Sequence, residues 1–383
     1  MRSEKRNQRQ KRKTRKKLIN LAVLLCFTVV ALAMLGTVTP VKAGPKAVYI
    51  APNLSNVADV VIARNWEKVA RQLGIEAVVK SSENNPKREA DEWDLAIAAG
   101  YDAIVAAPVD SSAIVSSVKK ANAAGIPVFA LGRIPDSGKV ILSTRADNWS
   151  LGTFSAEEVV RRLIKKHGEP RGLVLQICGV ININGRLRKE SQDAVFNKYP
   201  KIKVIWKTTK WLEKEFYDHT KSVASTNPDL DAIVLGTDVI YGVDAALKSL
   251  GKLKKIGDPG HIIIVGIDAD PRILGLIKED LWDASALQDM VGYGTALANY
   301  MKDFFDGKFR INTSQIVMKD YDPKTNRFRV KEGKLDAPGK VYHGSLVNWS
   351  EKPEGWQILT PSRIVDKNNA DDPTLWGNMK DKL

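Results

Sequence analysis

Cysteine and histidine are scarce in this chain, which has two Cys and four His among its 383 residues. Cys26 lies in a long apolar run near the N-terminus, so a chain that has lost this run keeps only Cys178 and can form no internal disulfide bond. The four His are scattered, and none belongs to a Cys/His cluster with the spacing of a zinc site. A folded domain must therefore be held by its hydrophobic core, and we expect no metal or other cofactor.

Motifs of catalysis are also missing from the sequence. It contains no Ser/His/Asp arrangement, no Walker loop and no paired-acid motif. A glycosidase needs two carboxylates in fixed opposition across the bond that it cleaves, and Asp59 with Asp268 is the pair that could serve. Without such a motif, the sequence favours a binding protein over an enzyme.

Positive charge is concentrated at the N-terminus. The formal net charge is +15, but residues 1–43 hold eleven bases and one acid, which leaves only about +5 for residues 44–383. A nucleic-acid-binding surface would need a strong basic patch in the folded part of the chain. We therefore expect no nucleic-acid partner.

An apolar run at residues 18–35 directly follows the basic residues 1–17. A basic region, an apolar region and the small-residue ending Val41-Lys42-Ala43 are typical of a secretory signal. We therefore expect residues 1–43 to be a signal peptide and the mature protein to be periplasmic or otherwise extracytoplasmic. The run is long enough to span a membrane, so an uncleaved anchor is the alternative. Cys26 follows Leu25 rather than a small residue, and we interpret it as an apolar residue rather than a lipidation site.

Short apolar strands alternate with amphipathic helices from residue 44 onward, and this series restarts near residue 150. The first series contains strands at 47–51, 77–79, 103–107 and 128–131. The second contains strands at 172–177, 204–207, 232–235, 262–267 and 284–288. Apolar strands separated by helices predict parallel sheets covered on both faces. The fold class is therefore α/β, with two doubly wound lobes.

The restart of the series also predicts the domain boundaries. Lobe one would comprise residues 44–146 and 289–314, and lobe two residues 149–285. A C-terminal extension, residues 317–383, would pack on the hinge or on one lobe. The chain would cross between the lobes three times, near residues 144–148, 285–289 and 312–318.

Hydrogen-bonding side chains gather in the loops that follow the strands, which is where open parallel sheets bind ligands. They are Asn56, Asp59, Asp110, Arg133, Asn182, Asn184, Arg186, Thr237, Asp238, Asp268 and Gln288. Because a hydroxyl group is both a donor and an acceptor, this mixture of carboxylates, amides and arginines suits a polyhydroxylated ligand. Asp110 and Asp238 could instead cap the helices that follow them.

Five motifs resemble those of the type I periplasmic sugar-binding proteins of ABC transporters, in the ribose-binding branch. They are Ser81-Ser-Glu-Asn-Asn-Pro-Lys-Arg-Glu, Ala107-Pro-Val-Asp-Ser, Ala124-Gly-Ile-Pro-Val, Asp147-Asn-Trp-Ser-Leu-Gly and Val265-Gly-Ile-Asp. The resemblance covers about residues 45–310. It implies a monomer with the type I fold that captures a small sugar or sugar alcohol between its lobes and delivers it to a membrane permease. A ligand-sensing module for a membrane kinase or chemoreceptor is the alternative.

The resemblance also implies a set of ligand-binding residues. They are Asn56, Arg133, Asn148, Arg186, Thr237, Asp238, Asp268 and Gln288, to which we add Asp59 as an acceptor. Arg186 matches the arginine that clamps the sugar from the second lobe. Arg188 lies two residues further, at the start of a helix predicted over 188–198, so we expect one of the two arginines to face solvent.

The sequence departs from the ribose-binding pattern at four positions in lobe one. Ala107 stands where that pattern has an Asn before Pro108. Ala58 and Asp59 stand where that family has two Phe, and Gly132 stands where an acid precedes Arg133. The site has therefore lost aromatic stacking, for which Trp149 and Trp211 are the candidate replacements. An acyclic polyol needs no flat stacking partner, and Asp59 can accept from an extra hydroxyl. These departures favour a sugar alcohol or an atypical sugar over ribose.

Overall fold

The computed structural model describes residues 44–309 except 238–240, and then 321–322, 327–328, 345–348, 356–360 and 362–379. Of the expected signal segment, residues 1–43, it describes only Arg12 and Arg15, so that prediction lies outside the described residues. Within the part of the chain that the structure describes, no helix is both long enough and apolar enough to cross a membrane.

The first of two large sheets has β1 near one edge and an antiparallel pair at the other. Its order is β13-β14-β5-β4-β3-β1-β2, and all neighbouring strands are parallel except β13 and β14. The strands are β1 (Lys46–Ala51), β2 (Glu76–Ser81), β3 (Ala103–Ala106), β4 (Val128–Leu131), β5 (Leu142–Ala146), β13 (Ser345–Asn348) and β14 (Trp356–Thr360).

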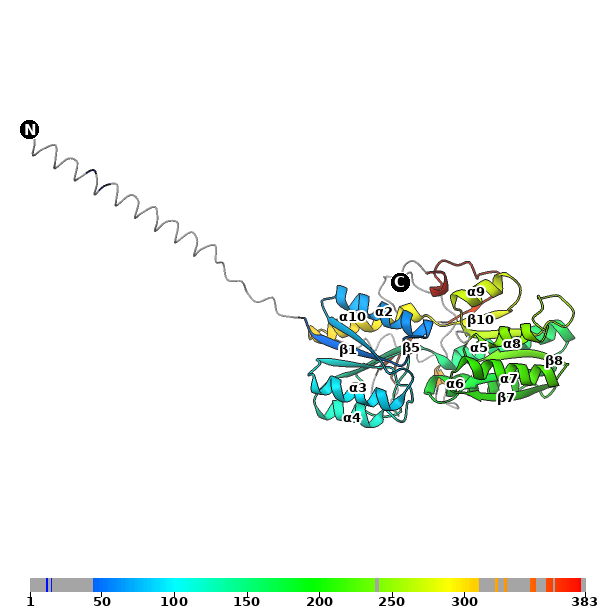
Figure 1. Ribbon diagram of the computed structural model, residues 1–383, viewed down its shortest axis with the longest axis horizontal. Coiled ribbons are helices and arrows are strands. Elements are labelled where there is room, and N and C mark those ends of the chain that lie inside the picture. The colour runs from blue at the N-terminus through cyan, green and yellow to red at the C-terminus, as the bar shows by residue number, and fades with distance from the viewer. Residues whose placement is uncertain are drawn as a thin grey trace, which may run out of the picture. The chain divides into compact units, whose positions relative to one another are not determined.

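The alternating side chains of strand β1 are buried on both faces of this sheet. Ala47 and Tyr49 pack into one apolar cluster, while Val48 and Ile50 pack into another, because successive side chains of a strand point to opposite faces. Helices α2 (Val57–Gln72) and α10 (Met290–Phe305) supply the first cluster. Helices α3 (Pro86–Ala98) and α4 (Val115–Ala123) supply the second. Figure 1 shows α2 and α10 on one face of the sheet and α3 and α4 on the other. This sheet and its four helices are called lobe one below.

The second sheet has the order β15-β10-β9-β8-β6-β7, with only β15 antiparallel. Its strands are β6 (Gly172–Gly179), β7 (Ile202–Thr209), β8 (Leu230–Leu235), β9 (Ile263–Asp268), β10 (Ala284–Leu287) and β15 (Ile364–Val365). Helices α5 (Asn148–His167) and α6 (Ile183–Phe196) cover one face. Helices α7 (Glu213–Thr226), α8 (Gly242–Ser249) and α9 (Pro271–Lys278) cover the other. This sheet and its helices are called lobe two.

The prediction of two doubly wound parallel-sheet lobes is confirmed. In the part of the chain that the structure describes, the chain passes between the sheets after β5, after β10 and between β14 and β15. The third predicted crossing, near 312–318, lies outside the described residues, and the exact lobe boundaries stay a prediction. Of the C-terminal extension, β14 adds a strand to the first sheet and β15 to the second. The strands β11 (Tyr321–Asp322) and β12 (Arg327–Phe328) form a separate two-stranded antiparallel sheet.

Candidate functional site

A pocket between the two lobes is lined by the loops that follow the strands of both sheets. It encloses about 610 Å³, part of which is open to solvent. Its lining residues are Tyr49, Asn56, Ala58, Asp59, Ile62, Ala107, Leu131, Gly132, Arg133, Asn182, Asn184, Arg188, Trp211, Thr237, Asp268, Gln288 and Met290. The pocket lies where an open α/β sheet is expected to bind a ligand, beyond the carboxyl ends of its strands.

Lobe one contributes a buried acid and an arginine to this pocket. Asn56 caps helix α2, and its Oδ1 accepts hydrogen bonds from the backbone N–H groups of Ala58 at 2.9 Å and Asp59 at 3.2 Å. Asp59 follows in the first turn, where the residue is only 6 % exposed. Burial raises the pKa of Asp59, whereas Arg133, with Nη2 at 3.6 Å from Asp59 Oδ1, opposes that rise. The two groups form an ion pair on the lobe-one side of the pocket.

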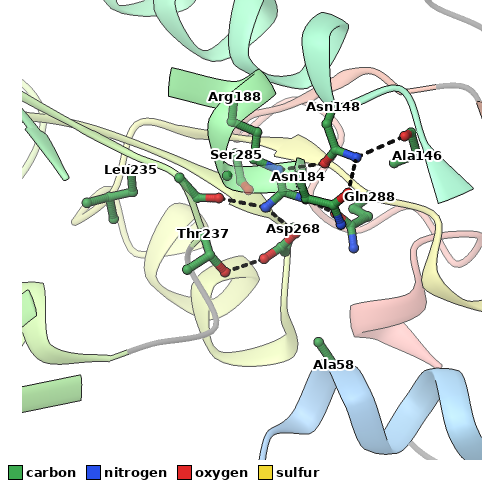
Figure 2. A network of polar contacts seen from close by, with 12 residues as sticks. Ala58, Ala146, Asn148, Asn184, Arg188, Leu235, Thr237, Asp268, Ser285 and Gln288 are labelled. Carbon is green, nitrogen blue, oxygen red and sulfur yellow. Dashed lines mark hydrogen bonds and ion pairs between the residues drawn. The ribbon is translucent and has the colours of Figure 1, made fainter. Parts of the chain in front are cut away.

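Lobe two contributes Arg188, which is 4 % exposed and held from three directions. Its Nε donates to Asn148 Oδ1 at 2.8 Å, and its Nη1 donates to the carbonyl oxygen of Gly236 at 2.6 Å. Its Nη2 donates to Gln288 Oε1 (Figure 2). A guanidinium fixed in this way presents its remaining donors in a defined direction.

Asp268 lies beside Arg188 at the end of β9. Its Oδ1 is 3.7 Å from Arg188 Nη1, and its Oδ2 accepts a hydrogen bond from the Thr237 hydroxyl (Figure 2). Among the described residues, no hydrogen-bond donor reaches the buried Oδ1. Burial raises the pKa of Asp268 to about 6, although Arg188 and the Thr237 hydroxyl both oppose the rise. The pocket therefore contains a buried carboxylate oxygen with unused capacity to accept a hydrogen bond.

The raised pKa of Asp268 predicts a specific pH dependence of stability. Between about pH 4 and pH 6 the folded, ligand-free protein binds a proton here that the unfolded chain has released, so stability falls as the pH rises through this window. The free energy of unfolding falls by about 3 kcal/mol at most when Asp268 loses this proton. Asp268→Asn should flatten the pH dependence of the free energy of unfolding, measured with urea at pH 4.5 and 7.5. Parallel slopes in the mutant and the wild type would contradict this assignment.

Trp211 brings an aromatic ring to the pocket. It follows β7 with a φ of +64°, a left-handed conformation that is uncommon for a large residue. Its ring packs directly on two glycines, because a Cβ at Gly179 would lie 2.7 Å from Trp211 Cδ2 and one at Gly185 would lie 2.8 Å from Trp211 Cζ2. Trp149, the other candidate for a replacement ring face, does not line the pocket.

Six of the nine residues proposed from the sequence line this pocket: Asn56, Asp59, Arg133, Thr237, Asp268 and Gln288. Asn148 lies behind it, where its Oδ1 holds Arg188 and its Nδ2 donates to Asn184 Oδ1 at 3.0 Å. Asp238 lies outside the described residues.

Arg186 does not line the pocket. Its Nη2 instead forms an ion pair with Asp136 Oδ1 at 2.7 Å, which links helix α6 of lobe two to a loop of lobe one. Nearby, Asn184 Nδ2 makes a second link by donating to the carbonyl oxygen of Gly132 at 2.8 Å. The structure thus places Arg186 in a contact between the lobes and Arg188 at the pocket.

The pocket is also lined by Arg188, Asn182, Asn184 and Trp211, which the proposed ligand-binding set did not include. The sequence had placed Asn182 and Asn184 among the polar loop residues and Trp211 among the candidate rings, but it had not selected Arg188. Helix α6 begins at Ile183 rather than near 188, so Asn184 and Arg188 are four residues apart on one helical face. Arg186, two residues from each of them, points elsewhere. An earlier helix start, indicated by Asn182 as the N-cap, was the signal that could have selected Arg188.

Comparison with known proteins agrees with this geometry. Residues 47–309, more than half of the chain, match the family described as "Periplasmic binding protein domain". The chain belongs to this family. The ribose import binding protein of Escherichia coli (strain K12) is 30% identical over 266 residues, which is 67% of this chain and 81% of that protein. The D-apiose import binding protein of Paraburkholderia graminis is 26% identical over 245 residues, covering 62% of this chain and 75% of that protein.

Another relative is the xylitol-binding protein of Mycolicibacterium smegmatis, which is 29% identical over 223 residues, or 57% of this chain and 61% of that protein. Among solved structures, an ABC transporter solute-binding protein from Bacillus halodurans with bound myo-inositol superposes with a TM-score of 0.66 at 19% identity. That alignment covers 86% of this chain and 98% of the other. The structural match confirms the fold of a type I periplasmic binding protein.

Proposed function

We propose that this periplasmic binding protein captures one small, uncharged polyhydroxylated ligand, a sugar or a sugar alcohol, in the pocket between its lobes. The observation that carries the proposal is the pair of arginine–aspartate contacts that meet there. Arg133 with Asp59 comes from lobe one, and Arg188 with Asp268 comes from lobe two. Each positive charge is balanced by a negative one, so a neutral ligand leaves no buried charge unpaired.

The same four side chains suit hydroxyl groups. A hydroxyl donates one hydrogen bond and accepts others, so it can donate to a carboxylate while it accepts from a guanidinium. Asp268 Oδ1, which lacks a donor among the described residues, is one such acceptor. Because contacts come from both lobes, a bound ligand favours the closed arrangement of the lobes over the open one.

The shape of the ligand depends on the aromatic surface in the pocket. Ala58 and Gly132 supply no ring to the lobe-one side, where Tyr49 is the aromatic residue that lines the pocket, and this loss of ring surface favours an acyclic polyol. Trp211 supplies an indole on the lobe-two side, which favours the flat C–H face of a cyclic sugar. Calorimetry with xylitol, erythritol and ribose separates these two cases.

We place this protein outside the cytoplasm, where it delivers its ligand as a monomer to an ABC transporter permease and performs no reaction on it. The basic and apolar N-terminal segment supports export. Membership of the family, and relatives that are named as import binding proteins, support transport rather than catalysis.

A thermal-shift screen of pentoses, hexoses and polyols tests this function. Ligand present at 100 times its dissociation constant should raise the free energy of unfolding by about 2.7 kcal/mol. Amino acids serve as the control set, because their two charges would enter a pocket whose own charges are already balanced. Stabilisation by amino acids, with none by any sugar or polyol, would overturn the proposed ligand class.

A further inference from the structure

The C-terminal residues 362–379 pack behind the pocket, against the loop that carries Asp268. The short 3₁₀ helix η3 (Trp376–Asn378) lies next to helix α9. Leu375, Trp376 and Met379 are buried in the same apolar cluster as Ile273 and Leu274 of α9. This segment lies beyond residue 309, where the match to the family ends.

One hydrogen bond connects this segment to the pocket residue itself. The indole Nε1 of Trp376, a residue only 2 % exposed, donates to the backbone carbonyl oxygen of Asp268 at 2.7 Å. Trp376 does not line the pocket, so any effect that it has on a ligand must pass through Asp268.

The backbone that receives this bond is strained. Asp268 has a φ of +125° and Ala269 a φ of +59°, values that residues with a Cβ rarely adopt. Such conformations are unfavourable for a residue with a Cβ and persist only where the surroundings hold them. On one side, the Ala269 N–H donates to Ser285 Oγ at 2.9 Å, and on the other the Trp376 indole holds the preceding carbonyl group.

The C-terminal segment is also pressed closely against the loop. A Cβ at Gly377 would lie 2.7 Å from the carbonyl oxygen of Ala269, so only glycine fits there without a shift. An ion pair of 2.6 Å between Lys278 and Asp371 fastens the segment to the end of α9. Lys367 and Asp280 form another ion pair at the same end.

We propose that Trp376 is a positioning residue for ligand binding, whose indole N–H holds the strained Asp268 backbone so that the Asp268 carboxylate faces Arg188 and the pocket. The inference rests on the proposed function, since it assigns to Trp376 the orientation of a ligand-binding group. It extends the binding machinery to the C-terminal segment.

The test compares Trp376→Phe with Trp282→Phe. Trp282 is a matched control, because it is 1 % exposed in the same lobe and its Nε1 has no hydrogen-bond partner among the described residues. Both variants lose similar apolar contact, but only Trp376→Phe loses a hydrogen bond. Affinity is measured by calorimetry with whichever of xylitol, ribose or myo-inositol stabilises the wild type most. We expect Trp376→Phe to raise Kd about threefold to tenfold and Trp282→Phe to leave it within about twofold.

A measurement without ligand separates this inference from the proposed function. Hydrogen exchange in the peptide that spans residues 263–274 should be faster in Trp376→Phe than in Trp282→Phe. If no sugar or polyol binds the wild type, the proposed ligand class fails. The exchange rate still tests whether the Trp376 indole holds the backbone at Asp268. Equal Kd values or equal exchange rates in the two variants would overturn the role of Trp376. Should Trp376→Phe fail to fold, Gly377→Ala, which displaces the same segment, must show the same two effects for the inference to stand.

Discussion

Arg188→Gln is expected to weaken ligand binding by about 2–5 kcal/mol, which is roughly thirtyfold to several thousandfold in Kd. The guanidinium is held by Asn148, Gly236 and Gln288, and it forms the ion pair with Asp268. Glutamine can restore neither the fork of donors nor the positive charge. The substitution also leaves the buried Asp268 carboxylate unpaired, which penalises its ionised form. Calorimetry at neutral pH measures the effect, with circular dichroism to confirm the folded fraction.

Arg186→Gln is the matched control, since it makes the same change two residues away on the same helix. Arg186 pairs with Asp136, and both side chains are about one third exposed, at 32% and 35%. Such pairs contribute about 0.2–1 kcal/mol, so Kd should rise by about fivefold at most, through weaker contact between the lobes. A large loss of affinity in Arg186→Gln with little loss in Arg188→Gln would show that the ligand is clamped from the other position.

Gly185→Ala is expected to destabilise the protein by about 2–4 kcal/mol and to disturb the pocket at the same time. A Cβ at this position would overlap the carbonyl oxygen of Gly179 and would lie 2.8 Å from Trp211 Cζ2. Backbone cannot move aside as the end of a flexible side chain can, so the start of α6 must shift. That shift moves Asn184 and the Trp211 ring, both of which line the pocket. Urea unfolding and ligand calorimetry together measure the two effects.

Gly275→Ala is the same substitution at another glycine, but here we expect it to stabilise the protein. Gly275 lies within helix α9, where a Cβ would meet nothing within 4 Å. Alanine is the better helix former, so this variant should be more stable by about 0.4–1 kcal/mol. If both variants unfold at the wild-type denaturant midpoint, the close packing of Gly185 against β6 and Trp211 is not a feature of the protein in solution.

Much of the fold could be predicted from the chain itself, because its physical signals are local. The alternation of apolar strands and amphipathic helices reflects strands that are buried on both faces, as Val48 and Tyr49 of β1 show by packing into opposite clusters. The restart of the series near residue 150 reflects the second sheet. Loop positions followed from the strands, so Asn56, Asp59, Arg133, Thr237, Asp268 and Gln288 were all selected before the structure brought them together.

Which of Arg186 and Arg188 faces the pocket could not be predicted in this way. It depends on the helical turn at which α6 begins, and Asn182 starts the helix at Ile183 by accepting from the Gly185 N–H at 3.1 Å. Shifting the start of a helix changes which face each residue occupies, since residues two apart point in different directions. The position of the Trp211 ring depends on a positive φ and on the space above Gly179 and Gly185, which lie in other segments of the chain.

The sequence by itself determined the two-lobe α/β architecture, the loops that form the site and the polar character of the pocket, because hydrophobic periodicity and strand ends are properties of neighbouring residues. Only the tertiary structure decided that Arg188 faces the pocket while Arg186 pairs across the lobes with Asp136. It also decided that Trp376, 108 residues after Asp268, donates a hydrogen bond to that residue's carbonyl group. Contacts of this kind join distant segments through the three-dimensional packing of both lobes, and no local pattern in the chain encodes them.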